Sequence, residues 1–232
     1  MARGSSAVGN HASSRWLAAL ALLLALTVLS APRRANAFRA KNTVPQTVFL
    51  PVQSNAAKDL GAAPLLVASR DLADPNFVKT VILVVHHDDE SVVGLILNRR
   101  TEVPLSRVFN DLEAAKGRAD PVYLGGPVDR SAVFAVLQSP VKVEGAEHVF
   151  GDIYLIVAKA LLEHTIAART DPSDFHVYLG YAGWTHDQLR REVELGAWSI
   201  LQADSETVFD SHPDTLWSRM ITKTEHRLVG LY

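Results

Sequence analysis

LGYAGWTHDQL (179–189) lies between two segments of different periodicity and decides how the centre of the fold is interpreted. The preceding run FHVYLG (175–180) is apolar and aromatic, which is typical of a strand. The following run THDQLRREVEL (185–195) places apolar side chains at helical spacing. The question is whether GYAGW (180–184) joins a strand to a helix or forms a loop that holds a ligand or a nucleophile.

Helix capping explains most of this stretch. Thr185 and Gln188 fit a capping box, in which the hydroxyl accepts the N–H of residue 188 and the glutamine amide reaches back. Trp184 and Leu189 have the spacing of a hydrophobic staple. Ala182 occupies the place where a GxSxG elbow carries its serine. We therefore interpret GYAGW as a strand-to-helix joint, and an anion-binding helix start is the alternative.

Composition excludes several kinds of chemistry. The chain has 232 residues, of which 48% are hydrophobic and 21% charged, as expected for a globular protein. It contains no cysteine, which excludes thiol catalysis, thiolate metal sites and disulfides. A domain of this size buries enough surface to fold without such a staple.

The N-terminal segment resembles an export signal. Arg3 and Arg15 precede the apolar run WLAALALLLALTVLSA (16–31), and Ala35-Asn36-Ala37 offers small residues at the spacing that a signal peptidase needs. We expect cleavage before Phe38 and a periplasmic or secreted protein. The run is shorter than the roughly 20 residues that span a bilayer, so no permanent membrane span is expected. An uncleaved anchor or an organellar targeting segment is the alternative.

The rest of the chain divides simply. We predict a signal peptide over residues 1–37, a flexible mature N-terminal tail over 38–60 and a single domain over 61–232. Without residues 1–37 the chain carries 19 Lys and Arg against 25 Asp and Glu, a net charge of −6. Proteins that bind duplex DNA neutralise phosphates with Lys and Arg, so no nucleic-acid partner is expected.

Apolar periodicity predicts a mixed architecture. Strands are expected at 64–69, 80–86, 91–98, 132–138, 152–157 and 175–180. Helices are expected at 158–170, 185–195 and 213–221, with a shorter one after Pro104. The strands come first in adjacent pairs and later alternate with helices, which favours an α+β fold over a regular βαβ repeat.

Two further motifs are interpreted as turns. HHDDE (86–90) separates two strands and carries polar residues that hairpin loops prefer, so a solvated turn is favoured over a metal site. The other histidines show no HExxH spacing, and neither a metal nor a cofactor is expected. In YLGGPVD (123–129), Gly125 and Gly126 permit a close backbone approach and Pro127 favours an extended Gly126. A sharp bend between strands is the default, and a backbone-lined pocket is the alternative.

Four blocks of sequence resemble the YqgE/AlgH family of bacterial proteins. They are ADPNFVKTVILVVHHDDESVVGLILNR (73–99), YLGGPVD (123–129), LGYAGWTHDQLRREVELGAW (179–198) and VFDSHPDTLW (208–217). The motif residues that carry the resemblance are Gly94, Gly125, Gly126, Pro127, Gly180, Gly183, Trp184, Leu189 and Trp198. The chain departs from the family pattern at Ser69 and Arg100, where proline is usual, at Gln138, where histidine is common, and at Asp187, which replaces a glycine.

The resemblance implies a fold more than a function. It implies an α+β arrangement with a bifurcated, largely antiparallel sheet that forms a pseudo-barrel, with helices packed outside. It brings no established catalytic residue. Some members are labelled transcriptional regulators, but family membership alone is a weak warrant for function.

Our leading hypothesis is therefore a non-enzymatic binding or regulatory domain that acts outside the cytoplasm, on an envelope protein or a small molecule. Candidate contact residues are Asn98, Tyr123, Tyr181 and Trp184, because amphipathic or polar tips beside glycine turns suit a ligand. An enzyme that uses His176, His186 or Asp74 in acid–base chemistry is the second hypothesis. A transcriptional regulator, as the family label suggests, is the third.

Overall fold

The structure is a computed structural model that describes residues 63–88 and 90–229, with side chains described as far as residue 226. The predicted signal peptide (1–37) and tail (38–60) lie outside the described residues. None of the helices in the described part of the chain is long and apolar enough to cross a membrane.

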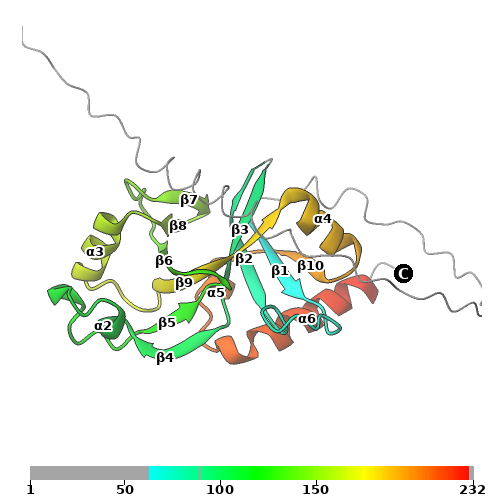
Figure 1. Ribbon diagram of the computed structural model, residues 1–232, viewed down its shortest axis with the longest axis horizontal. Helices are drawn as coiled ribbons and strands as arrows, with labels where there is room; N and C mark the ends of the chain where they lie inside the picture. Colours follow the sequence, from blue (N-terminus) through cyan, green and yellow to red (C-terminus); the bar gives the residue numbers. More distant parts are fainter. Residues whose placement is uncertain (1–62, 89, 230–232) are drawn as a thin grey trace, which may run out of the picture.

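Strands and short helices follow one another along the chain (Figure 1). The strands are β1 (Pro64–Ala68), β2 (Val81–His87), β3 (Ser91–Ile96), β4 (Arg100–Pro104), β5 (Pro121–Leu124), β6 (Val128–Gln138), β7 (Glu147–Phe150), β8 (Ile153–Ile156), β9 (Phe175–Thr185) and β10 (Trp198–Gln202). The helices are α2 (Leu105–Val108), the 3₁₀ turn η1 (Glu113–Ala115), α3 (Lys159–Ala167), α4 (His186–Glu194), α5 (Ser205–Val208) and α6 (Pro213–Val229).

One strand, β9, belongs to both halves of the sheet. The strand order is β10-β1-β2-β3-β9-β6-β8-β7, and β5 pairs with both β4 and β9. Residues 182–185 of β9 pair with β3, whereas residues 175–181 pair with β6. Every pairing is antiparallel except that of β5 with β9. The predicted α+β class is confirmed: the sheet branches at β9 and curls into a half-barrel.

The branch divides the molecule into two lobes. We call β1–β3 and β10, with α4 and α6, the first lobe, and β4–β8, with α2 and α3, the second lobe (Figure 1). One hydrophobic cluster, which includes Tyr178 of β9 and Met220 of α6, lines the shared inner face of the sheet. On the opposite face, a cluster around Trp184 lies under α4, and a cluster around Val177 lies under α2 and α3. Strands covered on both faces read as continuous apolar runs, as in β1 and β2.

The glycines of YLGGPVD bring two backbones into close contact. A Cβ atom on Gly126 would lie 2.1 Å from the carbonyl carbon and oxygen of Tyr181, and one on Gly125 would lie 2.3 Å from the oxygen of Gly180. Gly125 donates its N–H to the oxygen of Leu179 and accepts the N–H of Ile96, both at 2.9 Å. The space that a ligand would need is filled by β9, so the segment between β5 and β6 is a crossing and not a backbone-lined pocket.

Gly180 changes the direction of the side chains along β9. Its φ of +70° lies in the left-handed region that glycine tolerates. The register with β6 shifts between Val128 and Val133 at the same place. As a result, Tyr178 and Tyr181 both reach the inner cluster, although alternation in a regular strand would put them on opposite faces.

Several short helices and strands of the structure are missing from the sequence-based prediction. The strands β4, β5, β7 and β10 were not predicted, and neither were η1 and α5. Two of these strands, RTEVP and EHVF, carry little of the apolar alternation that marks a half-buried strand. They are strands because β5 and β8 supply hydrogen-bonding partners for them.

The crossing gives a stability test. Gly126→Ala should lower the free energy of unfolding by about 3 kcal/mol or more, because a methyl group cannot fit without separating the two backbones. Gly117→Ala is the control: nothing lies near its Cβ position, so it should cost only about 1–2 kcal/mol, for a left-handed backbone. Denaturant unfolding measures both. Equal losses would show that the crossing has room for a side chain.

Candidate functional site

The GYAGW segment is the end of a strand and not a loop. β9 continues through both glycines to Thr185, and α4 begins at His186. The hydroxyl of Thr185 accepts the N–H of Gln188 at 3.2 Å, which confirms the predicted cap. The reciprocal half of the capping box is not among the hydrogen bonds of the described residues; the amide nitrogen of Gln188 donates instead to Glu192 at 2.9 Å. The predicted strand-to-helix joint is therefore confirmed. The chain passes directly from β9, which ends at Thr185, to α4, which begins at His186.

One carboxylate holds both tryptophans of the GYAGW-to-W block. Glu192 Oε2 accepts the indole N–H of Trp184 at 2.9 Å and that of Trp198 at 2.8 Å. The two rings meet edge to face, with centroids 5.8 Å apart, and Phe77 contacts both. Buried indole N–H groups need an acceptor, so this motif is explained by packing without a ligand.

The structure places the four candidate contact residues in the interior or in backbone contacts. Tyr123, Tyr181 and Trp184 are all buried. Asn98 is half-buried: its Oδ1 accepts the N–H of Val81 and its Nδ2 donates to the oxygen of Lys79. Their role in ligand contact stays a prediction.

HHDDE lies at the β2–β3 hairpin: His86 and His87 end β2, and Asp88 and Glu90 lie between the strands, where a turn was predicted. Asp88 Oδ1 accepts the N–H groups of Glu90 and Ser91, and Asp88 Oδ2 lies 3.0 Å from Nε2 of His86. The ring of His87 lies 5.4 Å from that of His186 at the start of α4. Among the described residues, which leave out Asp89, no group of three His, Asp or Glu side chains could hold a metal ion.

The three acid–base candidates do not form a constellation. Asp74 accepts the N–H of Asn76 at 2.8 Å in a local turn between β1 and β2. His186 lies at the hairpin described above. His176 lies in the part of β9 that pairs with β6 of the second lobe. Of the three, His176 lies beside two tyrosines, and burial lowers its pKa.

Two aromatic rings pack against His176. Tyr123 from β5 stacks on it with centroids 4.6 Å apart, and Phe209, which follows α5, lies 4.9 Å away on a tilted plane. Tyr178 contacts the ring of Tyr123 at 5.4 Å. The Nδ1 atom of His176 and the hydroxyl of Tyr178 are buried and have no hydrogen-bond partner among the described residues. We call Tyr123, His176, Tyr178 and Phe209 the His176 cluster.

Burial and charge shift the titration of this cluster. Burial, together with the charge of Arg100, lowers the pKa of His176 to about 4, against a smaller opposing effect of Asp120. Burial raises the pKa of Tyr123 and raises that of Tyr178 well above its usual range. His176 is therefore neutral at neutral pH. Shifted groups that gather in one place are candidates for function.

An ion pair fixes the position of Asp120. The guanidinium of Arg118 is buried and donates from Nε to Asp120 Oδ2 at 2.8 Å. It also donates to the oxygen of Thr170 at 2.9 Å, just beyond the end of α3. Because cations are favourable near a helix C-terminus, Arg118 ties α3 to the loop before β5 and leaves Asp120 little freedom to move toward His176.

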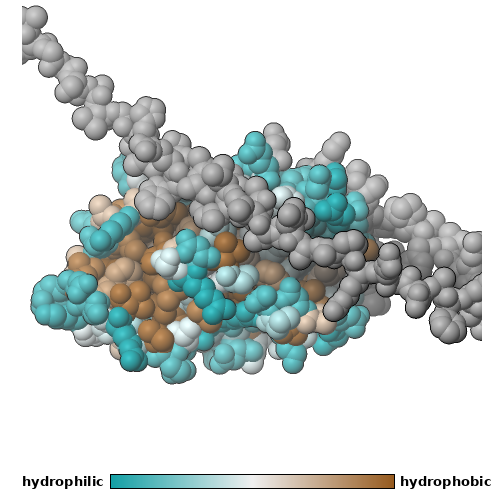
Figure 2. All heavy atoms as spheres, in the orientation of Figure 1, coloured by the Kyte–Doolittle hydropathy of each residue, from teal (hydrophilic) through white to brown (hydrophobic). Residues whose placement is uncertain are grey.

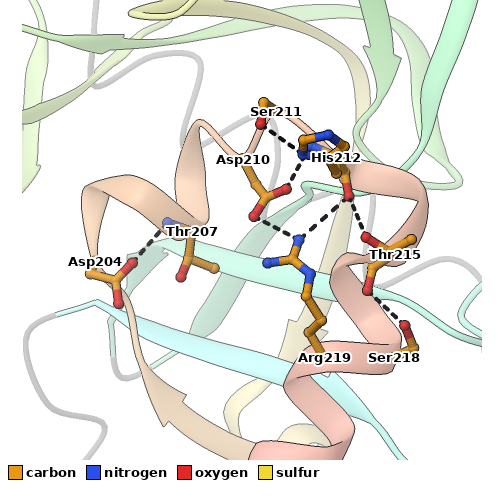
Figure 3. A network of polar contacts seen from close by, with 8 residues as sticks. All are labelled: Asp204, Thr207, Asp210, Ser211, His212, Thr215, Ser218 and Arg219. Carbon is orange, nitrogen blue, oxygen red and sulfur yellow. Dashed lines mark hydrogen bonds and ion pairs between the residues drawn. The ribbon is translucent and has the colours of Figure 1, made fainter.

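Phe209, whose ring contacts that of His176, lies in a segment that polar contacts hold in place (Figure 3). Asp204 caps α5 by accepting the N–H of Thr207 at 2.7 Å. Asp210 accepts a hydrogen bond from Arg219 of α6 and another from the N–H of His212, both at 2.7 Å. Residues 204–213, which we call the α5–α6 segment, are therefore fixed by two carboxylates.

The outer face of the second lobe is apolar. Figure 2 shows hydrophobic residues gathered over β5, β6 and β9, between α3 and α2. We call this the apolar face. Its half-buried side chains are Val103, Val108, Phe109, Leu112, Ala114, Val133, Val143, Ala146, Leu161 and Leu179. Contiguous apolar surface on a soluble protein is often a binding site.

The structural class is α+β. A branched, largely antiparallel sheet curls into a half-barrel, with α4 on the outer face of the first lobe and α2 and α3 on that of the second. Residues 65–228 match the AlgH-like family. The chain belongs to that family, which confirms the resemblance seen in the sequence.

Relatives and a solved structure agree. A UPF0301 protein of Chlorobaculum tepidum is 32% identical over 169 residues, which cover 72% of this chain and 89% of that protein. A UPF0301 protein of Streptomyces avermitilis is 34% identical over 171 residues, covering 71% and 87%. The solution structure of AlgH from Pseudomonas aeruginosa matches with a TM-score of 0.58 and 28% identity, covering 71% of this chain and 88% of that one.

Sequence reasoning found part of the His176 cluster. It named His176 and Tyr123, in two separate hypotheses. It missed Tyr178, Phe209 and the nearby Arg100 as members of one site. The departure from proline at position 100 was the available signal, because it places a cation beside the cluster.

The shared carboxylate gives a second prediction. Glu192→Ala should cost about 2–4 kcal/mol of unfolding free energy, because it leaves two indole N–H groups without an acceptor. The exposed Glu194→Ala on the same helix should stay within about 0.5 kcal/mol of the parent chain. Thermal or denaturant unfolding followed by tryptophan fluorescence measures both. A loss no larger than that of the control would show that the indoles find other partners.

The pKa of His176 predicts how stability depends on pH. The folded pKa of about 4 lies below the usual 6.5, so the unfolded chain binds the extra proton between these values and stability falls as the pH falls through this window. The loss should approach about 3 kcal/mol near pH 4 and then level off.

His176→Gln should remove this component, whereas His164→Gln, an exposed histidine of α3, should keep it. Unfolding free energies between pH 4 and 7.5 decide the matter. The assignment fails if both variants keep the same slope.

Proposed function

We propose that this chain is a non-enzymatic binding or regulatory domain that acts outside the cytoplasm and uses the apolar face to hold an envelope protein. The single observation that carries the proposal is the apolar face itself, with ten half-buried apolar side chains around one cluster. The polar and charged side chains that could take part in catalysis support the non-enzymatic function indirectly. Most are engaged in caps, turns and ion pairs, such as those of Thr185, Asp88 and Arg118.

The location outside the cytoplasm is supported by the N-terminal sequence alone. Residues 1–37 carry the basic, apolar and small-residue regions of an export signal. Protein recovered separately from cytoplasmic and extracytoplasmic fractions should start at or near Phe38 only in the latter, as read by intact mass and N-terminal peptide sequencing. A cytoplasmic chain that keeps residues 1–37 would remove this part of the proposal and return attention to the regulator label.

Substitutions on the apolar face test the binding function. Immobilised mature chain should retain one protein from an envelope extract, which is then purified and titrated. Leu161→Glu should weaken that binding about tenfold or more, because it places a charge within an apolar interface. Val143→Glu, in the loop before β7, gives a second position if the first variant folds poorly.

Leu195→Glu is the matched control. Leu195 ends α4 in the first lobe and is 85% exposed, so the same change of charge falls on another surface. Each variant is first compared with the parent chain by thermal unfolding. Retention of no protein, or equal binding by the Leu161 and Leu195 variants, would count against the apolar face as the binding surface.

An enzyme is the second candidate, and the His176 cluster is the observation that favours it. A neutral imidazole with an unpartnered Nδ1 could accept a proton, and acid–base partners converge in space without a linear motif. A hydrolase screen on the mature chain tests this idea. Activity that follows a low-pH titration and is lost in His176→Ala would make the chain an enzyme.

A further inference from the structure

We propose that the α5–α6 segment is an acid-released lid, which opens when His176 takes up a proton. The inference concerns a motion within the chain and stands independently of the binding function proposed above.

The geometry leaves a protonated His176 without support. Protonation turns both ring nitrogens into donors, yet Nδ1 has no acceptor among the described residues. The rings of Tyr123 and Phe209 pack against the imidazole, and Nδ1 is buried, although the side chain as a whole is partly exposed. An imidazolium in this place would be a desolvated charge with an unmade hydrogen bond, which is costly.

The charged groups around the ring do not relieve this cost. Arg100 of β4 disfavours the added charge, and it is the largest electrostatic influence on His176. Asp120, before β5, favours the charge, but it is already held by Arg118. The backbone carbonyl of Pro172, in the loop before β9, also favours the charge, but its effect on the pKa of His176 is smaller than those of burial and Arg100. Tyr178, beside the ring on β9, is neutral because burial raises its pKa.

The lid side carries the remaining charges, and they are already engaged or distant. Asp210 binds Arg219 and the N–H of His212. Asp214 at the start of α6 acts on Tyr123 and not on His176. His212 donates to or accepts from the hydroxyl of Ser211 and is exposed.

Of the two rings that contact His176, that of Phe209 is held less firmly by the structure. Tyr123 is 4% exposed and belongs to a strand paired on both sides. Phe209 is only half-buried and follows α5, a helix of four residues. Such a short helix has almost no stability of its own, so its packing against the inner cluster and its two carboxylate contacts hold it in place. Water should therefore reach the buried Nδ1 of His176 by displacement of Phe209.

Hydrogen exchange of the mature chain tests this directly, because amides of the segment are hydrogen-bonded. The N–H groups of Thr207, Val208 and Phe209 are bonded to Asp204 and Ser205. If opening restores the usual pKa of 6.5 to a histidine that titrates at about 4 when closed, the opening equilibrium should rise about 20-fold between pH 7 and pH 5. Protection of these amides, corrected for intrinsic rates, should fall by that factor.

His176→Gln should abolish the change with pH, whereas His212→Gln, in the segment itself, should keep it. Phe209→Leu should raise exchange already at pH 7. The proposal is overturned if protection does not change with pH, if the His176 variant responds like the parent chain, or if amides of β2 and β3 lose protection equally. The last outcome would mean that the whole chain unfolds, and none of these results depends on finding a binding partner.

Discussion

The fold depends on the contact between two backbones, where the segment between β5 and β6 crosses β9. Gly125 joins the two arms of the sheet, since it donates to Leu179 of β9 and accepts from Ile96 at the end of β3. Gly126 and Gly180 remove the side chains that would separate the strands. The crossing fixes the branch point, and with it the position of Tyr123 in β5 against Tyr178 of β9.

The crossing also shows why glycine was difficult to interpret from sequence. We interpreted Gly180 and Gly183 as part of a joint between a strand and a helix, because glycine often marks the end of a strand. In the structure both lie inside β9: one provides a bulge, and the other pairs with Val93 of β3. Gly94, on β3, is in a similar place, since a Cβ there would lie 2.5 Å from the side chain of Ile82. Local sequence cannot tell a turn from a close approach, because the second backbone comes from elsewhere in the chain.

Other elements were predictable where the local signal was strong. The apolar runs of β1, β2 and β3 and the spacing of α3, α4 and α6 marked these elements, although α6 continues eight residues past its predicted end. The His176 cluster could not be predicted from the sequence as one site, because Tyr123, His176 and Phe209 come from three separate segments. The apolar face was hidden for the same reason: its side chains are spread from Val103 to Leu179.

The tryptophans and the tyrosines of the described chain occupy different parts of the molecule. Of the three tryptophans of the described chain, Trp184 and Trp198 lie in the cluster under α4, and Trp217 of α6 packs against that cluster and against the shared inner one. The four tyrosines of the described chain, at positions 123, 154, 178 and 181, belong to β5, β8 and the β6-paired part of β9. Indole emission and phenol absorbance thus report on different halves of the same molecule. The protein carries a built-in pair of optical probes, with which the order of events in the two halves can be followed without a label.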